Sequence, residues 1–126
     1  MKNYKKYYLI PAPPDEVYIA LTNPLTIQIW TNGSCEMSTE PGFEFSMFDG
    51  NISGKNLEFI ENKKIVQQWY FGDQPELSIV TIKLHPDKKG TSVELLHTNI
   101  PDEAFEDIAE GWDNSYFGSL EEFYGE

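Results

Sequence analysis

The stretch that most constrains the fold is the last quarter of the chain, residues 100–124. Its large apolar side chains recur at steps of three or four, which is the spacing of a single stripe along one side of a helix. The stripe consists of Phe105, Ile108, Trp112, Tyr116, Leu120 and Phe123. Pro101 suits the first turn, because the N–H that proline lacks would have no partner there. We therefore predict one long C-terminal helix that runs from near Pro101 past Leu120, with an aromatic face that another element must cover.

The segment before this helix is typical of strands. From Phe43 onward, apolar and polar residues alternate, most cleanly at Val80, Ile82 and Leu84, and such alternation indicates a sheet with one buried face. Turn-forming residues separate the runs at 49–50, 61–64, 72–75 and 85–90. The pattern predicts a meander of antiparallel strands, which must curl in order to wrap one helix.

The N-terminal third predicts smaller elements. Residues 4–10 are expected to form an edge strand, and residues 15–22 and 25–30 to form two short helices bounded by prolines. A short strand is expected at residues 35–38, and a bulge at Gly54. The second short helix is expected to turn three side chains inward, namely Leu25, Ile29 and Trp30.

Together these elements predict an α+β fold in one domain, residues 1–126: about six antiparallel strands curled around the long helix. A curled sheet and a straight helix touch along a line. The space beside that line is filled either by large side chains, as an ordinary core, or by a small apolar or aromatic ligand. The side chains expected to face this space are Trp30, Phe45, Trp69, His97, Trp112 and Tyr116.

Little in the sequence predicts catalysis. His97 shares a strand face with Val93 and Leu95, so it is either a hydrogen-bonded core histidine or the polar contact that orients a guest. His85, His97 and Cys35 have no metal-ligand spacing, and no catalytic set, metal site or cofactor motif is recognised. Gly111 beside Trp112 is expected to allow close approach of the helix to the sheet.

The charge restricts the partners. The net charge is −12, and the nine basic residues are all lysines. Nucleic acids and anionic membranes are therefore poor partners. Without arginine, a bidentate clamp on carboxylate or phosphate is not available, so neutral rings rank above fatty acids and phospholipids. The single cysteine and the short N-terminal apolar run, which fits neither a signal peptide nor a membrane span, predict the cytoplasm.

An ordered set of short motifs resembles the domain shared with the activator of Hsp90 ATPase. The set is Ile10-Pro11-Ala12-Pro13, Val17, Thr22-Asn23-Pro24, Trp30, Gly42-Phe43, Asp49-Gly50, Gly54, Trp69, Gly90-Thr91, His97 and Gly111-Trp112. The resemblance implies a helix-grip fold of the START/Bet v 1-like (SRPBCC) superfamily, which holds a hydrophobic cavity between its sheet and its long helix. The activator itself carries an additional N-terminal domain.

Three functions follow as hypotheses. The first is a small-molecule binding module that uses the cavity. The second, implied by the resemblance, is a chaperone-interacting protein with an Hsp90-type partner or a role in stress. The third is a cyclase- or hydrolase-type enzyme on the same fold, which ranks last because the chain offers no convincing catalytic set.

Overall fold

The computed structural model describes residues 1–72 and 76–125, so most of the predicted turn at 72–75 lies outside the described residues. The strands are β1 (Lys2–Ile10), β2 (Glu44–Met47), β3 (Ile52–Ile60), β4 (Lys64–Trp69), β5 (Ser78–Asp87) and β6 (Gly90–Ile100). The α-helices are α1 (Pro14–Thr22), α2 (Pro24–Thr31), α3 (Phe105–Gly111) and α4 (Phe117–Tyr124). A 3₁₀ turn, Asp102–Ala104, precedes α3, and a π-helical turn, Trp112–Tyr116, joins α3 to α4.

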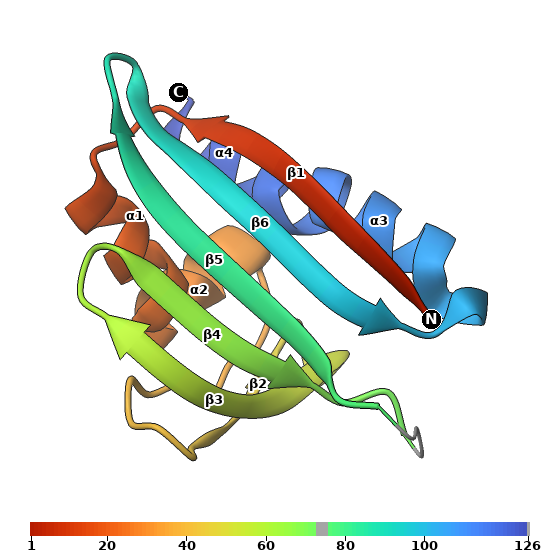
Figure 1. The fold of residues 1–126 in the computed structure, drawn as a ribbon. Coiled ribbons are helices and arrows are strands. Elements are labelled where there is room, and N and C mark those ends of the chain that lie inside the picture. The colour runs from red at the N-terminus through yellow and green to blue at the C-terminus, as the bar shows by residue number, and fades with distance from the viewer. Residues whose placement is uncertain (73–75, 126) are drawn as a thin grey trace.

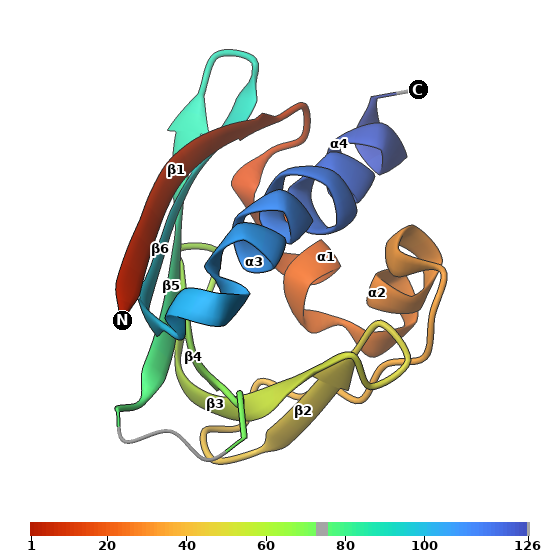
Figure 2. The ribbon, with the colours of Figure 1, turned by 90° about the vertical axis from the view of Figure 1, so that its right-hand side faces the viewer.

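The strands form one antiparallel sheet in the order β1-β6-β5-β4-β3-β2, with β1 at one edge and β2 at the other (Figure 1). The sheet bends so that β2 and β3 curl beneath the helices, and all the α-helices lie on its concave face (Figure 2). This arrangement confirms the predicted α+β helix-grip architecture, including the edge position of the first strand and the two short helices after it.

The apolar and polar residues that alternate along the predicted strands are alternately buried and more exposed in the structure. On β5, Val80, Ile82 and Leu84 are buried beneath the helices, whereas Lys83 is exposed. The bulge expected at Gly54 was wrong, since the register irregularity of β3 lies between Asn56 and Glu58. Gly54 is needed for a different reason, because a Cβ there would overlap the carbonyl oxygen of Gln68 on β4.

The short strand expected at residues 35–38 is also not formed. The backbone there makes one isolated antiparallel bridge, in which Glu36 and Ser46 exchange N–H···O hydrogen bonds of 2.9 and 3.0 Å. A single bridge ties this loop to β2 without extending the sheet.

The inward face of α2 differs from the prediction. Trp30 is buried as expected, but Leu25 is 70% exposed and Ile29 is 67% exposed. The Trp30 indole N–H donates to the Ala20 carbonyl of α1 at 2.7 Å, which fixes the side of α2 that faces inward. Ile27 lies three residues before Trp30 and therefore shares its face, so Ile27 is fully buried in place of the two predicted side chains.

The C-terminal helix contains an irregularity that changes its buried face. In the π-helical turn, the Phe117 N–H donates to the Trp112 carbonyl, five residues back rather than four. The extra residue in this turn rotates α4 about the helix axis relative to α3. As a result Phe117 is fully buried and Phe123 is 37% exposed, so the predicted stripe holds through Trp112, Tyr116 and Leu120 and is wrong for Phe123.

A polar cluster fastens the π-helical turn to the edge strand. The Tyr4 hydroxyl, the Lys6 ammonium and the Tyr8 hydroxyl all donate to Asp113 Oδ1, at 3.1, 2.8 and 2.7 Å. These donors, with Lys6 the largest contributor, hold the pKa of Asp113 below its usual value. Because Asp113 belongs to the π-helical turn, the cluster stabilises the helix in the register that buries Phe117.

Gly118→Ala tests this register. A Cβ at Gly118 would lie 2.5 Å from the Asp113 carbonyl oxygen, a contact that the π-helical turn creates. We expect a loss of about 1–3 kcal/mol in the free energy of unfolding, measured by urea titration, although alanine favours a regular helix. The control is Gly111→Ala, where a Cβ meets open space and a gain of up to about 1 kcal/mol is expected. A stabilising Gly118→Ala would contradict the assigned register.

Candidate ligand site between the sheet and the C-terminal helix

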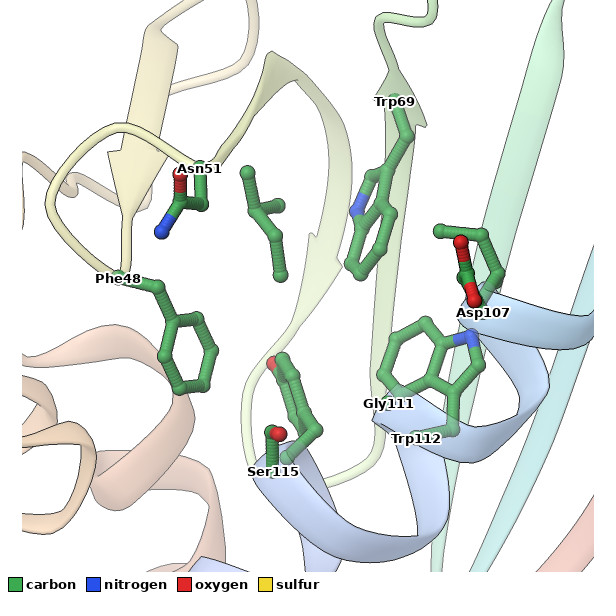
Figure 3. A pocket seen from close by; sticks show the side chains of 10 residues that line it. Phe48, Asn51, Trp69, Asp107, Gly111, Trp112 and Ser115 are labelled. Atoms are coloured by element: carbon green, nitrogen blue, oxygen red, sulfur yellow. The ribbon is translucent and has the colours of Figure 1, made fainter. Parts of the chain in front are cut away.

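A pocket of about 230 Å³ opens between the β2–β3 turn, β4 and the C-terminal helix. Its walls are Phe48, Asn51, Ile52, Trp69, Asp107, Ile108, Gly111, Trp112, Ser115 and Tyr116. Figure 3 shows labelled side chains approaching it from separate elements: Phe48 and Asn51 from the turn, Trp69 from β4, and Asp107, Trp112 and Ser115 from the helix. The aromatic residues form the interior, while Asn51, Asp107 and Ser115 are solvent-exposed at the rim.

Three of the six predicted site residues line this pocket, namely Trp69, Trp112 and Tyr116. The other three, Trp30, Phe45 and His97, are buried but do not line it. Trp30 packs edge-on against Tyr116, with ring centroids 5.2 Å apart, and His97 lies edge-on to Trp112 at 5.8 Å. Trp30 and His97 therefore pack against side chains of the pocket wall without lining the pocket themselves.

Sequence reasoning missed several wall residues, of which Phe48 is the clearest. Phe48 follows β2 directly and was not among the six predicted site residues. The strand ends at Met47, and Phe48 and Asp49 both adopt left-handed backbone conformations, with φ of 54° and 58°. This change of backbone direction turns Phe48 toward the pocket. The strong Asp49-Gly50 turn signal was the available clue.

Gly111 has a different role from the one expected. A Cβ at this position would meet no atom within 4 Å, so Gly111 does not mediate close packing of helix on sheet. It lines the pocket instead. Because glycine has no side chain, there is space in the pocket at this position that any larger residue would fill.

The centre of the pocket wall is a stacked pair of tryptophans. The rings of Trp69 and Trp112 lie 4.7 Å apart at an interplanar angle of 24°, and Tyr116 packs against Trp112 at 4.6 Å. Offset stacking of this kind is favourable beyond the area it buries. Each indole also donates its N–H to a different buried polar residue, which fixes the orientation of both rings.

His97 holds Trp112. The Trp112 indole N–H donates to His97 Nδ1 at 3.0 Å, and an indole nitrogen can only donate. Neutral His97 must therefore carry its proton on Nε2, which donates to Ser78 Oγ at 2.9 Å, and the Ser78 hydroxyl donates to the Thr98 carbonyl at 3.0 Å. Burial lowers the pKa of His97 to about 4, so the imidazole is neutral near pH 7.

A second network holds Trp69. Its indole N–H donates to Gln67 Oε1 at 3.0 Å, and the Gln67 amide donates to Asn56 Oδ1 at 2.9 Å. The Asn56 amide in turn donates to the Ser38 carbonyl at 2.8 Å. Gln67 and Asn56 are buried, and together they fix the orientation of one aromatic ring. Both networks fix the orientation of the rings in the pocket wall.

Tyr116 is the exception among the buried polar groups of the wall. It is 3% exposed, and its hydroxyl has no hydrogen-bond partner among residues 1–72 and 76–125. Burial, with a smaller effect from nearby Cys35, raises its pKa, so the hydroxyl keeps its proton. A buried hydroxyl without a partner is unusual and costs stability. In a residue that lines a pocket, it is a natural contact for a guest.

Other reactive groups do not form a site. Burial raises the pKa of Cys35 to about 11, so the thiol is protonated near pH 7 and is a weak nucleophile. Within the described part of the chain, no three His, Cys, Asp or Glu side chains are grouped so as to hold a metal ion. The described helices are also too short or too polar to cross a membrane.

Comparison with known proteins identifies the family. The sequence profile described as "Activator of Hsp90 ATPase homolog 1-like protein" matches residues 11–125. Among curated relatives, the human activator of 90 kDa heat shock protein ATPase homolog 1 is 32% identical over 114 residues, which are 89% of this chain and 34% of the human protein. The chain therefore spans about a third of the length of that relative.

Solved structures show the same fold over nearly the whole chain. The crystal structure of an HSP90 activator from Plasmodium falciparum is 25% identical, with a TM-score of 0.87 that covers 98% of this chain and 96% of that one. An Aha1 dimer from Colwellia psychrerythraea, 22% identical, has a TM-score of 0.81 over 98% and 96% of the two chains. On its sequence and its fold, this chain belongs to the family of activator of Hsp90 ATPase homolog 1-like proteins.

Proposed function

We propose that the chain is a binding domain for a small aromatic molecule, which enters the pocket between β4 and the C-terminal helix. The observation that carries the proposal is the preorganised wall. The stacked Trp69 and Trp112 are each fixed by a buried hydrogen bond, and they adjoin a Tyr116 hydroxyl that has no partner in the described structure.

The size of the pocket limits the guest. A dry apolar cavity of about 150 Å³ is enough to bind benzene, whereas drug-sized ligands occupy roughly 300–1,000 Å³. At about 230 Å³, this pocket suits a single substituted ring. Long acyl chains and sterols exceed it. The composition agrees, since a chain without arginine has no bidentate clamp for a fatty acid carboxylate.

The chemistry of the walls favours a ring over water. Water in a cavity needs two to four polar partners, and the interior of this pocket offers mainly aromatic and isoleucine surface. A ring would instead gain contact with Trp69, Trp112 and Phe48. A hydroxyl or carbonyl on the ring would provide the missing hydrogen-bond partner for Tyr116.

Isothermal titration calorimetry with neutral single rings, such as phenol and 2-phenylethanol, tests the proposal. Gly111→Leu is expected to abolish binding without unfolding the protein, because it fills space that is open beside the backbone. The matched control is Asn114→Leu, which adds the same side chain at an exposed neighbouring position outside the pocket and is expected to leave binding unchanged. Absence of binding by the unmodified chain, or binding that survives Gly111→Leu, would contradict the proposal.

A second candidate function is interaction with an Hsp90-type chaperone. The observation in its favour is the Plasmodium structure, which is described as an HSP90 activator and whose length this chain covers to 96%. A chain of nearly this size thus carries that description.

For the chaperone we expect binding with little activation. The 114 matched residues cover about a third of the human relative, and a single module lacks the gain that linked modules obtain from effective concentration. In an ATPase assay with a purified Hsp90-type chaperone, the 126-residue chain should form a complex yet leave turnover nearly unchanged. Several-fold stimulation by this chain would contradict the expectation, and absence of any complex would remove the second candidate function.

A further inference from the structure

The pocket carries one charged side chain, and its sign is negative. Among the ten residues that line the pocket, Asp107 is the only one with a formal charge. Figure 3 shows it on the helix that also carries Trp112. Its carboxylate makes no hydrogen bond or ion pair with the residues that the structure describes, so its charge is not neutralised within the protein.

The walls around this carboxylate are aromatic. Phe48, Trp69, Trp112 and Tyr116 supply the ring surface of the pocket. The face of an aromatic ring carries partial negative charge and attracts cations, most strongly in tryptophan, and cages of several rings bind quaternary and alkyl ammonium groups. The pocket therefore combines two features that each favour a positive guest, namely aromatic faces and a free carboxylate.

The distribution of lysine strengthens the same preference. No lysine occurs between residues 7 and 54 or after Lys89, so the β2–β3 turn and the whole C-terminal helix, which supply most of the pocket wall, contain no basic residue. The C-terminal segment carries further carboxylates at Glu103, Glu106 and Glu110. With a net charge of −12, the molecule as a whole attracts cations and repels anions.

We propose that the ligand is an amine that is protonated at neutral pH and attached to a single ring. This inference rests on the proposed binding function and specifies the ligand class. The ring lies against Trp69 and Trp112, and the ammonium group lies at the rim near Asp107. At the rim the charge keeps part of its hydration, which avoids the large cost of burying an unpaired ion.

Three probes of similar size and different charge separate this inference from simple ring binding. They are 2-phenylethylammonium, 2-phenylethanol and phenylacetate, which are positive, neutral and negative at pH 7. We expect the cation to bind about tenfold more tightly than the alcohol, since cation–π contact and an ion pair with Asp107 both add to affinity. Phenylacetate should bind more weakly than the alcohol.

Two variants that each remove one negative charge show which carboxylate causes the preference for the cation. Asp107→Asn should bring the affinities for the cation and for the alcohol close together. Glu106→Gln removes the same charge at an exposed neighbouring position outside the pocket, and it should retain most of the preference. A preference lost equally in both variants would mean that the general negative field, rather than Asp107, selects the cation, and would overturn the assigned contact.

The remaining outcomes also decide the matter. If the alcohol binds as tightly as the cation in the unmodified chain, the amine inference fails and the aromatic binding function stands. If none of the three probes gives a saturable titration, the amine inference and the aromatic binding function both fail. Addition of salt should reduce the difference between the cation and the alcohol, because screening weakens an ion pair at the rim.

Discussion

Replacement of Trp112 by alanine is expected to reduce the free energy of unfolding by about 3–5 kcal/mol. Trp112 is 2% exposed, stacks on Trp69 at 4.7 Å and packs against Phe117 at 5.6 Å. Its loss would leave a cavity where the helix meets the sheet. It would also leave His97 Nδ1 without the donor that the indole supplies.

Trp112→Phe separates these contributions. Phenylalanine keeps an aromatic ring in the stack but cannot donate to His97, so the expected loss is about 1–3 kcal/mol, close to the cost of an unsatisfied buried acceptor. Urea titration of the two variants gives both values. If alanine costs less than about 1 kcal/mol, Trp112 does not join the helix to the sheet and the account of the buried face is wrong.

The second large effect is a loss of stability in mild acid. Burial lowers the pKa of His97 from 6.5 to about 4, and no charged partner offsets it. Between these two values the unfolded chain binds a proton that the folded chain does not, so the stability is present above pH 6.5 and falls as the pH drops toward 4. The pKa difference corresponds to about 3 kcal/mol across this window.

His97→Gln tests the assignment. Glutamine does not titrate, so the free energy of unfolding of this variant should change little between pH 6.5 and the onset of carboxyl protonation. His85→Gln removes the half-exposed histidine, which contacts Glu94 at 2.9 Å, and this comparison variant should keep the part of the slope that belongs to His97. The carboxyl groups of Glu94, Asp102 and Asp113 have lowered pKa values, so their contribution is lost only at the acid end of the range. An unchanged slope in His97→Gln would contradict the buried network.

The architecture was predictable because it depends on local periodicity. The stripe that includes Trp112, Tyr116 and Leu120 predicted the C-terminal helix, and alternation along β5 predicted its buried face. Two of the errors arose where one backbone event changed the phase of a pattern. The π-helical turn moved burial from Phe123 to Phe117, and the left-handed residues after Met47 turned Phe48 toward the pocket. Neither change in the backbone is visible in the spacing of apolar residues along the sequence.

The candidate site was only half predictable for a different reason. Trp69, Trp112 and Tyr116 of the predicted aromatic set line the pocket, since large apolar residues on facing elements meet wherever a sheet curls over a helix. The partners that fix these rings could not be foreseen. Ser78 meets His97 across two neighbouring strands, and Asn56 meets Gln67 likewise, at separations of 19 and 11 residues. Such pairs depend on strand register, which no local pattern specifies.

The central claim is that a small ring binds against the stacked tryptophans, and the indole N–H resonances of isotope-labelled protein test it directly. Trp69 and Trp112 line the pocket, whereas Trp30 donates to the Ala20 carbonyl and does not line it, so the protein contains its own reference signal. During titration with 2-phenylethanol, we expect the Trp69 and Trp112 signals to shift and saturate together, and the Trp30 signal to move far less. No saturable shift at Trp69 and Trp112, or equal shifts at all three indoles, would contradict the claim.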